Sequence, residues 1–238
     1  RKTEYMEKKK EVLIIIPAYN EEESIEKVIN NLKQNYSQYD YVIINDGSHD
    51  HTSEICHKNK YKIIDLPVNL GLTGAFQTGL KYAYKKGYDY AIQFDADGQH
   101  LPEYIPAMVD KIEEGYDMVI GSRFVEKPKP RSLRMLGSRV ISTAIKITTG
   151  VHIADPTSGM RLFNKTLIKE FAENINYEPE PDTVSFLIKQ GVKVAEVQVE
   201  MKEREAGESY LNLSRSIVYM TKMFVSIIIL QNFRNRKK

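Results

Sequence analysis

The first half of the chain alternates short apolar runs with amphipathic segments, and this alternation limits the fold more than any other feature. Runs rich in β-branched residues predict five strands, a buried one at residues 12–16 and further ones at 41–44, 62–64, 90–94 and 118–120. Helical periodicity follows the first four, at residues 22–35, 53–60, 71–86 and 102–114. Apolar strands separated by helices are typical of a parallel sheet covered on both faces. Ligands of such a sheet bind at the carboxyl ends of its strands.

The second half has a less regular pattern. It predicts a helix at 133–149, a strand within the loop 155–163, a helix at 183–190, an alternating strand at 192–199 and a long helix at 211–233. We find no apolar run of the roughly 18–20 residues that a membrane span needs, and the nearest candidate is 223–230.

Composition excludes several classes of protein. Hydrophobic residues make up 42% and charged residues 28% of the 238 residues, which is ordinary for a globular chain and excludes global disorder. The net charge is only +2, so nothing in it indicates a nucleic-acid partner. Cys56 is the one cysteine, which rules out a disulfide within the chain and fits a reducing compartment.

Basic residues are concentrated in one stretch of the chain. Between residues 123 and 146 the only acid is Glu126, and the cations are Arg123, Lys127, Lys129, Arg131, Arg134, Arg139 and Lys146. Such a stretch favours binding to phosphate or anionic lipid. The alternative is a solvated basic loop and helix face.

The loop after the first predicted strand reads Pro-Ala-Tyr-Asn-Glu-Glu over residues 17–22. It has neither the glycine fingerprint of a dinucleotide-binding fold nor a phosphate-binding P-loop. Tyr19 could stack on a base and Glu21 could accept an N–H from it. The alternative is a helix-capping turn in which Asn20 is the N-cap.

Two further loops could approach a nucleotide. Residues 45–50 read Asn-Asp-Gly-Ser-His-Asp, in which Asp46 could bind it; the alternative is an Asp-Gly turn before a helix. Residues 69–74 open a helix rich in small residues, which could bring a helix N-terminus near a phosphate. Close packing of that helix on the sheet is the alternative.

The fourth predicted strand ends in Asp-Ala-Asp-Gly-Gln-His over residues 95–100, the strongest local signal. Residues two apart on a strand face the same way, so Asp95 and Asp97 can share one hard cation, with Gln99 continuing the face. An EF-hand does not fit, because its last ligand position would be Pro106. A solvated acidic turn is the alternative.

Four later segments offer phosphate ligands. Arg123 follows the fifth strand, and Arg134 and Ser138 stand four apart, so a helix would place them on one face. The guanidinium fork of arginine suits phosphate. Residues 155–161 and 204–209 complete the set. Each segment alone could be a structural turn or an ion pair.

Together and in this order, these segments resemble the family 2 glycosyltransferases with the A-type nucleotide-sugar-binding fold, and within them the polyprenyl-phosphate and dolichol-phosphate sugar synthases. The resemblance covers roughly residues 12–209. It implies a Rossmann-like, mostly parallel α/β sheet flanked by helices, with C-terminal amphipathic helices. A catalytic domain would span residues 1–210, with a nucleotide-sugar half at about 11–122 and an acceptor half at about 123–210, followed by an amphipathic helix and basic tail at 211–238.

The resemblance also implies roles for individual residues. The donor nucleotide sugar would be bound by Pro17, Tyr19, Glu21, Asp46, Asp95 and Ala96. Mg²⁺ or Mn²⁺ would be held by Asp95, Asp97 and Gln99, and the acceptor phosphate by Arg123, Arg134 and Ser138. Asp97, Arg204 and Asp155 would be catalytic, with Arg204 over the phosphates and Asp155 shaping the acceptor side. The family usually has aspartate where this chain has Asn45.

The implied reaction is an inverting transfer in which the acceptor oxygen attacks the anomeric carbon and the nucleotide diphosphate leaves. Metal and arginines would stabilise the charge that grows on the leaving group. A monophosphate acceptor is already mostly anionic at neutral pH, since its second pKa is about 6. We therefore assign no general base.

The expected function is transfer from a nucleotide-diphosphate sugar, UDP-glucose or UDP-N-acetylglucosamine, to a polyprenyl phosphate for cell-surface polysaccharide modification. Competing hypotheses are a transferase that extends a glycan hydroxyl and an inactive nucleotide-sugar-binding module, against which the intact Asp95 and Asp97 argue. A dehydrogenase is disfavoured by the missing glycine fingerprint.

The end of the chain points to the membrane surface. Residues 224–230 are largely apolar and are followed by Arg234, Arg236, Lys237 and Lys238. A basic helix with an apolar face can lie in the bilayer interface, which predicts a peripheral enzyme on the cytoplasmic face of the membrane. The alternative is a helix contact within a homo-oligomer or with a small membrane partner protein.

Overall fold

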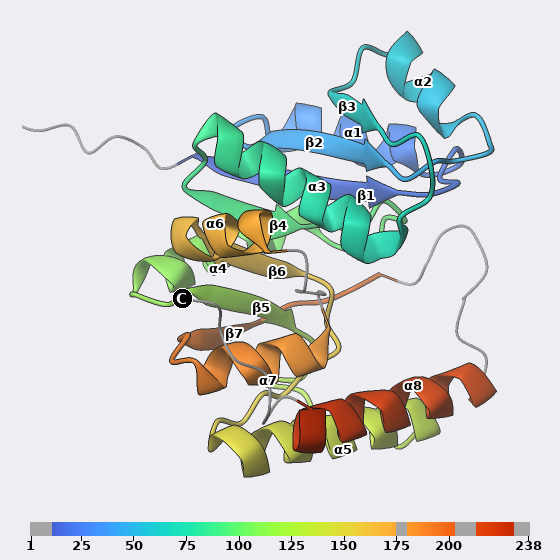
Figure 1. The fold of residues 1–238 in the computed structure, drawn as a ribbon. Helices are drawn as coiled ribbons and strands as arrows, with labels where there is room; N and C mark the ends of the chain where they lie inside the picture. The colour runs from blue at the N-terminus through green and yellow to red at the C-terminus, as the bar shows by residue number, and fades with distance from the viewer. Residues whose placement is uncertain (1–10, 175–179, 203–212, 231–238) are drawn as a thin grey trace, which may run out of the picture.

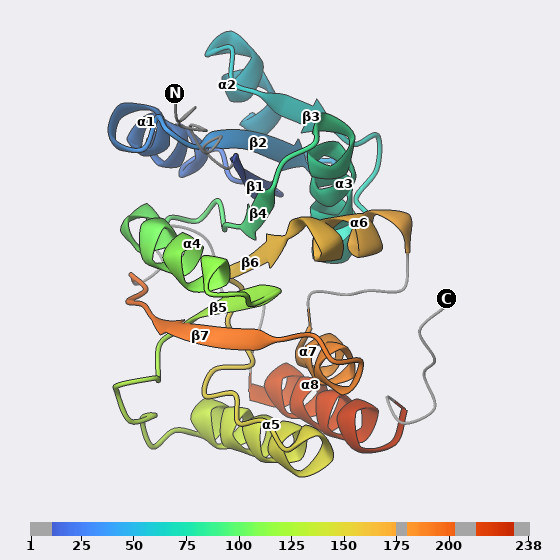
Figure 2. The same ribbon diagram turned by 90° about the vertical axis from the view of Figure 1, so that its left-hand side faces the viewer.

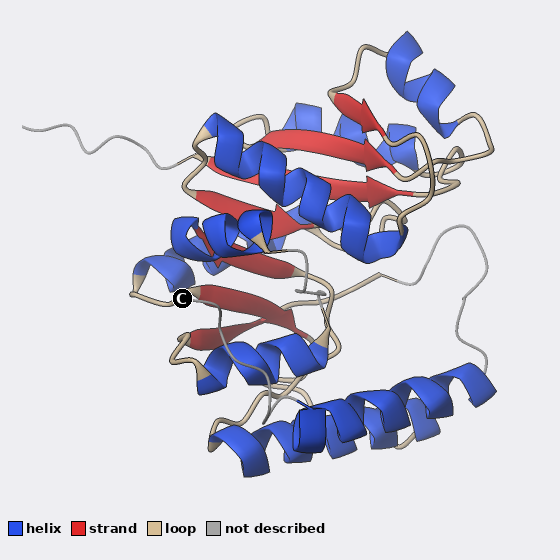
Figure 3. Ribbon diagram, viewed as in Figure 1, coloured by secondary structure: helices blue, strands red, loops and turns tan. Residues whose placement is uncertain are grey.

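A seven-stranded sheet forms the centre of the molecule, and helices lie beyond its β7 edge (Figures 1 and 3). The computed structural model describes residues 11–174, 180–202 and 213–230. In space the strands follow the order β3-β2-β1-β4-β6-β5-β7. Their bounds are β1 Val12–Ala18, β2 Asp40–Asn45, β3 Ile63–Asp65, β4 Tyr90–Gln93, β5 Met118–Ser122, β6 Arg161–Asn164 and β7 Val194–Gln198.

Helices cover both faces of this sheet (Figure 2). On one face lie α1 (Ile25–Asn35), α2 (Thr52–Lys58) and, after a 3₁₀ turn at Pro102–Tyr104, α4 (Ile105–Glu113). On the other lie α3 (Gly71–Lys86), α6 (Lys165–Glu173) and α7 (Pro181–Lys189). The helices α5 (Leu133–Thr149) and α8 (Leu213–Val225) lie side by side beyond α7, and a π-helical turn at Ser226–Leu230 continues α8.

The predicted parallel sheet is confirmed, with one reversed strand. The pairs β1–β2, β1–β4, β2–β3 and β5–β7 are parallel. Strand β6, expected within residues 155–163 but with no direction assigned, lies antiparallel between β4 and β5. Because both neighbours oppose β6, β4 and β5 still point the same way, and their carboxyl ends meet at one edge.

The apolar run of β1 is buried on both faces, as its sequence predicts. Leu13 and Ile15 pack with α3 in one core cluster, whereas Ile14 and Ile16 pack with α1 and α4 in the other. Successive side chains of a strand point to opposite faces, so an uninterrupted apolar run suits a strand with helices on both sides.

Several helix bounds differ from the prediction. Helix α1 begins at Ile25 rather than at residue 22, because the positive φ of 56° at Asn20 is followed by a turn over residues 22–24. Helix α6 was not predicted; it is short and capped by Asn164, whose side chain accepts from the Leu167 N–H at 3.0 Å. The terminal helix is α-helical only to Val225, and residues 211, 212 and 231–233 of its predicted range lie outside the described residues.

Gly79 lets α3 lie directly against β1, and its replacement by alanine should destabilise the protein. An added Cβ would lie 2.2 Å from Cγ2 of the buried Ile15. We expect Gly79→Ala to lower the free energy of unfolding by about 1–3 kcal/mol, because overpacking in the core outweighs the gain in helix propensity. Chemical denaturation measures this.

Gly137 in α5 provides the control for Gly79. The three atoms nearest to its added Cβ all belong to the Met220 side chain, with Cγ at 2.6 Å, and Met220 is only partly buried, so it can shift more easily than the fully buried Ile15. Gly137→Ala should therefore cost less than Gly79→Ala. Equal losses would contradict the proposed packing constraint at Gly79.

Candidate active site

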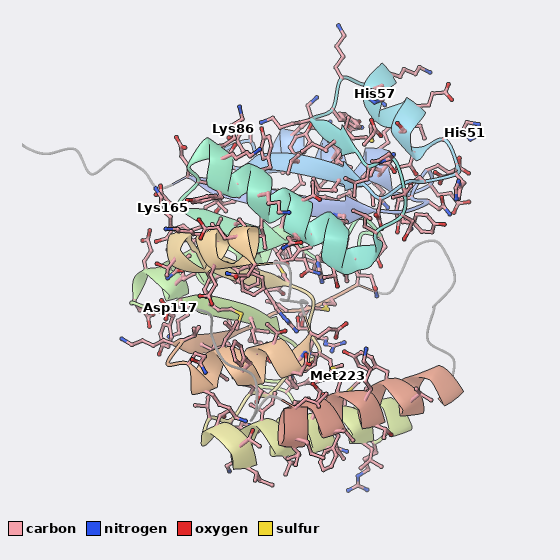
Figure 4. The ribbon with its side chains drawn as sticks, viewed as in Figure 1. His51, His57, Lys86, Asp117, Lys165 and Met223 are labelled. Carbon is pink, nitrogen blue, oxygen red and sulfur yellow. The ribbon has the colours of Figure 1, made fainter. Side chains whose placement is uncertain are left out.

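The polar loops of the first half gather at the carboxyl ends of the strands. In Figure 4, His51 lies at this edge, and Asp117, which directly precedes β5, lies at the opposite one. The loops after β1, β2 and β4 all open on the His51 edge, where ligands of open α/β sheets bind. The motifs predicted to carry chemistry are thus brought together.

A pocket of about 390 Å³ lies between the loops after β1 and β2 and the start of α3. Four of the predicted donor residues line it, namely Pro17, Tyr19, Glu21 and Asp46. Residues 69, 71, 72 and 75 form the opposite wall, so the segment that opens α3 takes part in the pocket. An aromatic ring and carboxylates around a concave apolar surface suit a nucleotide.

Asp46 joins the walls of this pocket. Its Oδ1 accepts the Leu70 N–H at 2.7 Å, and its own N–H donates to the Ala18 carbonyl oxygen at 2.8 Å. The next residue must be glycine, because Gly47 has a φ of +66° and an added Cβ would lie 2.8 Å from the Asn69 nitrogen. Asp46 and Gly47 therefore form the predicted turn, and Asp46 also lines the pocket.

Asn20 fixes the loop after β1 against the loop after β2. Its Oδ1 accepts the His49 N–H at 2.9 Å, and its N–H donates to Ser48 Oγ at 3.0 Å. The capping alternative for Asn20 is wrong, because the N-cap position of α1 is Ser24. The side chain of Asn20 instead holds together two loops that line the pocket.

Asn45 has a structural partner that accounts for the amide at this position. Its Nδ2 donates to Asp65 Oδ1 at 2.7 Å, and its Oδ1 accepts the Ser48 N–H at 3.2 Å. An aspartate here would place a second carboxylate against Asp65 and lose the donor. In this chain Asn45 therefore joins β2 to β3 and supports the turn at Ser48.

His100 supports the acidic loop after β4 and was missed by the sequence analysis. Its Nδ1 accepts the Asp95 N–H at 2.9 Å, so its Nε2 carries the hydrogen, 3.4 Å from Asp95 Oδ2. Only 2% of the His100 side chain is exposed. A histidine five residues after an acid gives no periodic signal, and the contact exists only because Gly98 turns the loop with a φ of +78°.

Asp95 and Asp97 both lie beyond the end of β4, which is at Gln93, so the strand alternation that predicted a shared face does not apply to them. Asp95 is partly exposed, whereas Asp97 is 7% exposed and its Oδ1 accepts the Gln99 N–H at 3.0 Å. Within the described ranges no group of three His, Cys, Asp or Glu side chains could hold a metal. Carboxylates supplemented by phosphate oxygens and water are how Mg²⁺ is usually bound.

The other predicted residues of this loop are less directly placed for a ligand. The Gln99 amide donates to the Lys202 carbonyl oxygen at 3.3 Å, which ties the loop to the chain after β7. The Ala96 side chain is buried in the core, so only its backbone could meet a donor. Gly159 faces Asp95 from the loop before β6, where an added Cβ would lie 3.7 Å from Asp95 Oδ2.

Arg123 and Asp155, predicted separately, form one buried ion pair. Arg123 donates to Asp155 from Nε at 2.7 Å, from Nη2 at 2.9 Å and from its backbone N–H at 3.1 Å. Asp155 is 0% exposed. A paired, bidentate geometry of this kind holds the guanidinium in one orientation.

A fully buried arginine shapes the loop that carries Asp155. Arg161 donates from Nε to the Ser158 carbonyl oxygen and from Nη2 to the Pro156 carbonyl oxygen, both at 2.9 Å. Burial lowers the pKa of this guanidinium. Glu196 on β7 accepts the Ala154 and Asp155 N–H groups at 2.6 and 2.8 Å, so the loop is bound from two sides.

The remaining predicted acceptor residues lie on α5 or outside the described residues. Ser138 is 1% exposed, and its Oγ accepts a hydrogen bond from Lys129 Nζ at 2.9 Å. Arg134 lies in the first turn of α5, but its side chain is not among those described. Arg204 also lies outside the described residues.

Fold and site thus define a Rossmann-like α/β protein with a nucleotide-sized pocket beside an acidic loop. Residues 13–171 match the family described as Glycosyl transferase family 2. The chain therefore belongs to glycosyl transferase family 2, and it is a glycosyltransferase.

Two named relatives match this chain over most of its length and most of their own. The chain is 33% identical over 213 residues to the UDP-N-acetylglucosamine–dolichyl-phosphate N-acetylglucosaminyltransferase of Methanococcus voltae, in a match that covers 79% of this chain and 84% of that protein. It is 29% identical over 227 residues to the undecaprenyl-phosphate mannosyltransferase of Micrococcus luteus, covering 89% and 93%.

Solved structures show the same fold. The glucosyl-3-phosphoglycerate synthase of Mycobacterium tuberculosis in complex with Mn²⁺, UDP-glucose and phosphoglyceric acid matches with a TM-score of 0.70. The match covers 96% of this chain and 82% of that one, at 16% identity. The A-type nucleotide-sugar-binding fold expected from the sequence is therefore confirmed.

Proposed function

We propose that this glycosyltransferase moves a sugar from a nucleotide-diphosphate donor to a polyprenyl phosphate, with inversion at the anomeric carbon. One observation supports this best: the acidic loop lies between a nucleotide-sized pocket and a cationic acceptor side. Asp95 in the acidic loop faces Gly159 in the loop before β6. The loop before β6 also carries Asp155, which binds Arg123. In this order, the pocket suits a nucleotide, the carboxylates suit a diphosphate with its metal, and the cations suit an acceptor phosphate.

In this proposal the donor occupies the pocket between β1, β2 and α3. Tyr19 stacks on the base, Glu21 and Asp46 contact the nucleoside, and UDP-glucose or UDP-N-acetylglucosamine is the expected donor. Asp95 and Asp97 would hold Mg²⁺ or Mn²⁺, with Gln99 alongside; the cation supplies charge neutralisation for the leaving diphosphate. The structural relatives carry Mn²⁺ or Mg²⁺ with UDP, which supports this choice.

The acceptor is proposed from the basic side chains and from the relatives. Arg123 and Arg134 are assigned to the acceptor phosphate and Arg204 to the phosphates, whereas the buried Ser138 lies on the acceptor side as a partner of Lys129. The relatives of M. voltae and M. luteus are named for transfer to dolichyl phosphate and undecaprenyl phosphate. A phosphate acceptor needs no general base, whereas a glycan hydroxyl would need one.

We further propose that α5 and α8 place the enzyme on the cytoplasmic membrane surface. No helix in the described part of the chain is long and apolar enough to cross a membrane. Large apolar side chains are nevertheless exposed on both helices, namely Leu136, Val140, Ile147, Val218, Phe224, Val225, Ile229 and Leu230. Arg139, Lys146 and Lys222 lie among them, which suits an anionic interface.

A transfer assay tests the proposal. The protein is incubated with Mn²⁺, a panel of labelled nucleotide sugars and a short-chain polyprenyl phosphate, with a free oligosaccharide as the competing acceptor. We expect an organic-soluble, acid-labile labelled product from one donor. Label that enters only the oligosaccharide would replace the proposal with the glycan-extending alternative.

A further inference from the structure

We propose that Lys129, which lies in the loop between β5 and α5, binds the acceptor phosphate directly through its ammonium group. The inference rests on the proposed function, in which the acceptor is a phosphate, and it adds the side chain that binds this phosphate. Arg123, also on the acceptor side, already donates to Asp155 from Nε and Nη2. Fewer of its guanidinium N–H groups therefore remain for a ligand.

Two serines of α5 hold the Lys129 ammonium in one place. Lys129 Nζ donates to Ser138 Oγ at 2.9 Å and to Ser142 Oγ at 3.0 Å. The same nitrogen lies 5.7 Å from the centroid of the Phe124 ring. An ammonium group has three N–H donors, so a third is available to a ligand. The backbone is fixed as well, because Arg139 Nη2 donates to the Lys129 carbonyl oxygen at 2.7 Å.

The ammonium is a half-buried charge whose contacts are neutral. Among residues 11–174, 180–202 and 213–230, its hydrogen-bond partners are the two serine hydroxyls, and no carboxylate lies within ion-pair distance. Burial lowers the pKa of Lys129, with Asp155 and Glu196 acting in the opposite direction. A cation held this way is costly without an anion, so the arrangement favours a ligand that brings one.

The charges around Lys129 leave an excess of positive charge for that ligand. Arg123 and Arg139 are its cationic neighbours, and Asp155 and Glu196 its acidic ones. Asp155 accepts hydrogen bonds from Arg123 and Thr157, and both Glu196 oxygens accept backbone N–H groups. Three cations face two occupied carboxylates. A monophosphate of charge near −2 complements this set.

Under this proposal, Ser138 acts through Lys129 rather than by touching the phosphate itself. Its hydroxyl is buried beneath the ammonium, together with that of Ser142. Both serines are therefore positioning residues. Their spacing of four along α5 places the two hydroxyls on one helix face, where a single ammonium can meet both.

The test compares Lys129→Met with Lys127→Met. Lys127 is an exposed lysine of the same loop that pairs with Glu200, so it matches the loss of one charge without the buried setting. For each variant, KM for a short-chain polyprenyl phosphate, kcat, Kd for UDP with Mn²⁺ and Tm are measured. We expect Lys129→Met to raise the acceptor KM by about tenfold or more, with Kd for UDP unchanged.

Stability separates binding from a structural role. A binding lysine that is half-buried and unneutralised should leave Tm unchanged or raised when methionine replaces it, whereas a structural lysine should lower it. Equal acceptor KM for both variants, in an enzyme that transfers to polyprenyl phosphate, would overturn the role of Lys129 alone. A wild-type protein that never uses the phosphate would overturn the proposed function and Lys129 together.

Discussion

Replacement of Asp97 by alanine should lower kcat by a hundredfold to a thousandfold while the protein remains folded. Asp97 is buried in the acidic loop next to the proposed diphosphate position, and it is one of two carboxylates assigned to the cation. Loss of an electrostatic group that acts on the leaving group typically costs about 10²–10³ in rate. Turnover with saturating donor and Mn²⁺ measures the effect.

The variant Asp97→Asn removes the negative charge of this side chain but keeps its size and shape. Its amide oxygen can still accept the Gln99 N–H, so the loop and Tm should be retained while turnover is lost. Asp110→Ala, which removes an exposed carboxylate from α4, is the control and should leave kcat near the wild-type value. Near-normal turnover of both Asp97 variants would exclude the metal assignment.

Replacement of Asp155 by leucine should have the largest effect on stability. It would leave Arg123 without its bidentate partner and remove the acceptor of the Arg123 N–H and of Thr157 Oγ1. Breaking a buried pair from one side costs about 3–5 kcal/mol; about 3 is expected here because the Arg123 side chain is still 25% exposed and can reach water. Chemical denaturation measures the loss.

A second variant tests whether the lost stability comes from the uncompensated charge. Arg123→Met combined with Asp155→Leu should be more stable than Asp155→Leu alone, because no unpaired charge remains. Lys111→Met, which breaks an exposed pair with Glu114, should move the unfolding midpoint little. A double variant as unstable as the single one would assign the loss to packing instead.

The gathering of the loops after β1, β2 and β4 at one edge could be predicted from the sequence because its signals are local. Each apolar run ends in a polar loop, and in a parallel sheet these ends share one edge, so Tyr19, Asp46 and Asp95 had to approach one another. The acceptor side was harder. Arg123 and Asp155 lie 32 residues apart, and their pairing depends on β6 entering the sheet in the reverse direction.

The contacts of Lys129 and His100 could not be predicted from the sequence pattern. Lys129 is one of seven cations in its stretch, and only the position of α5 decides that it meets Ser138 and Ser142 while Lys127 meets Glu200. His100 acquires its role from a glycine turn that brings its ring back to Asp95.

The sequence by itself determined the strands of the first half and the edge at which the polar loops gather, because period-two and period-3.6 patterns are properties of neighbouring residues. Tertiary structure alone decided the direction of β6, the pairing of Arg123 with Asp155 and the choice of Lys129 among the cations. Those outcomes depend on contacts between segments far apart in the chain, which become fixed only when the sheet closes around its core.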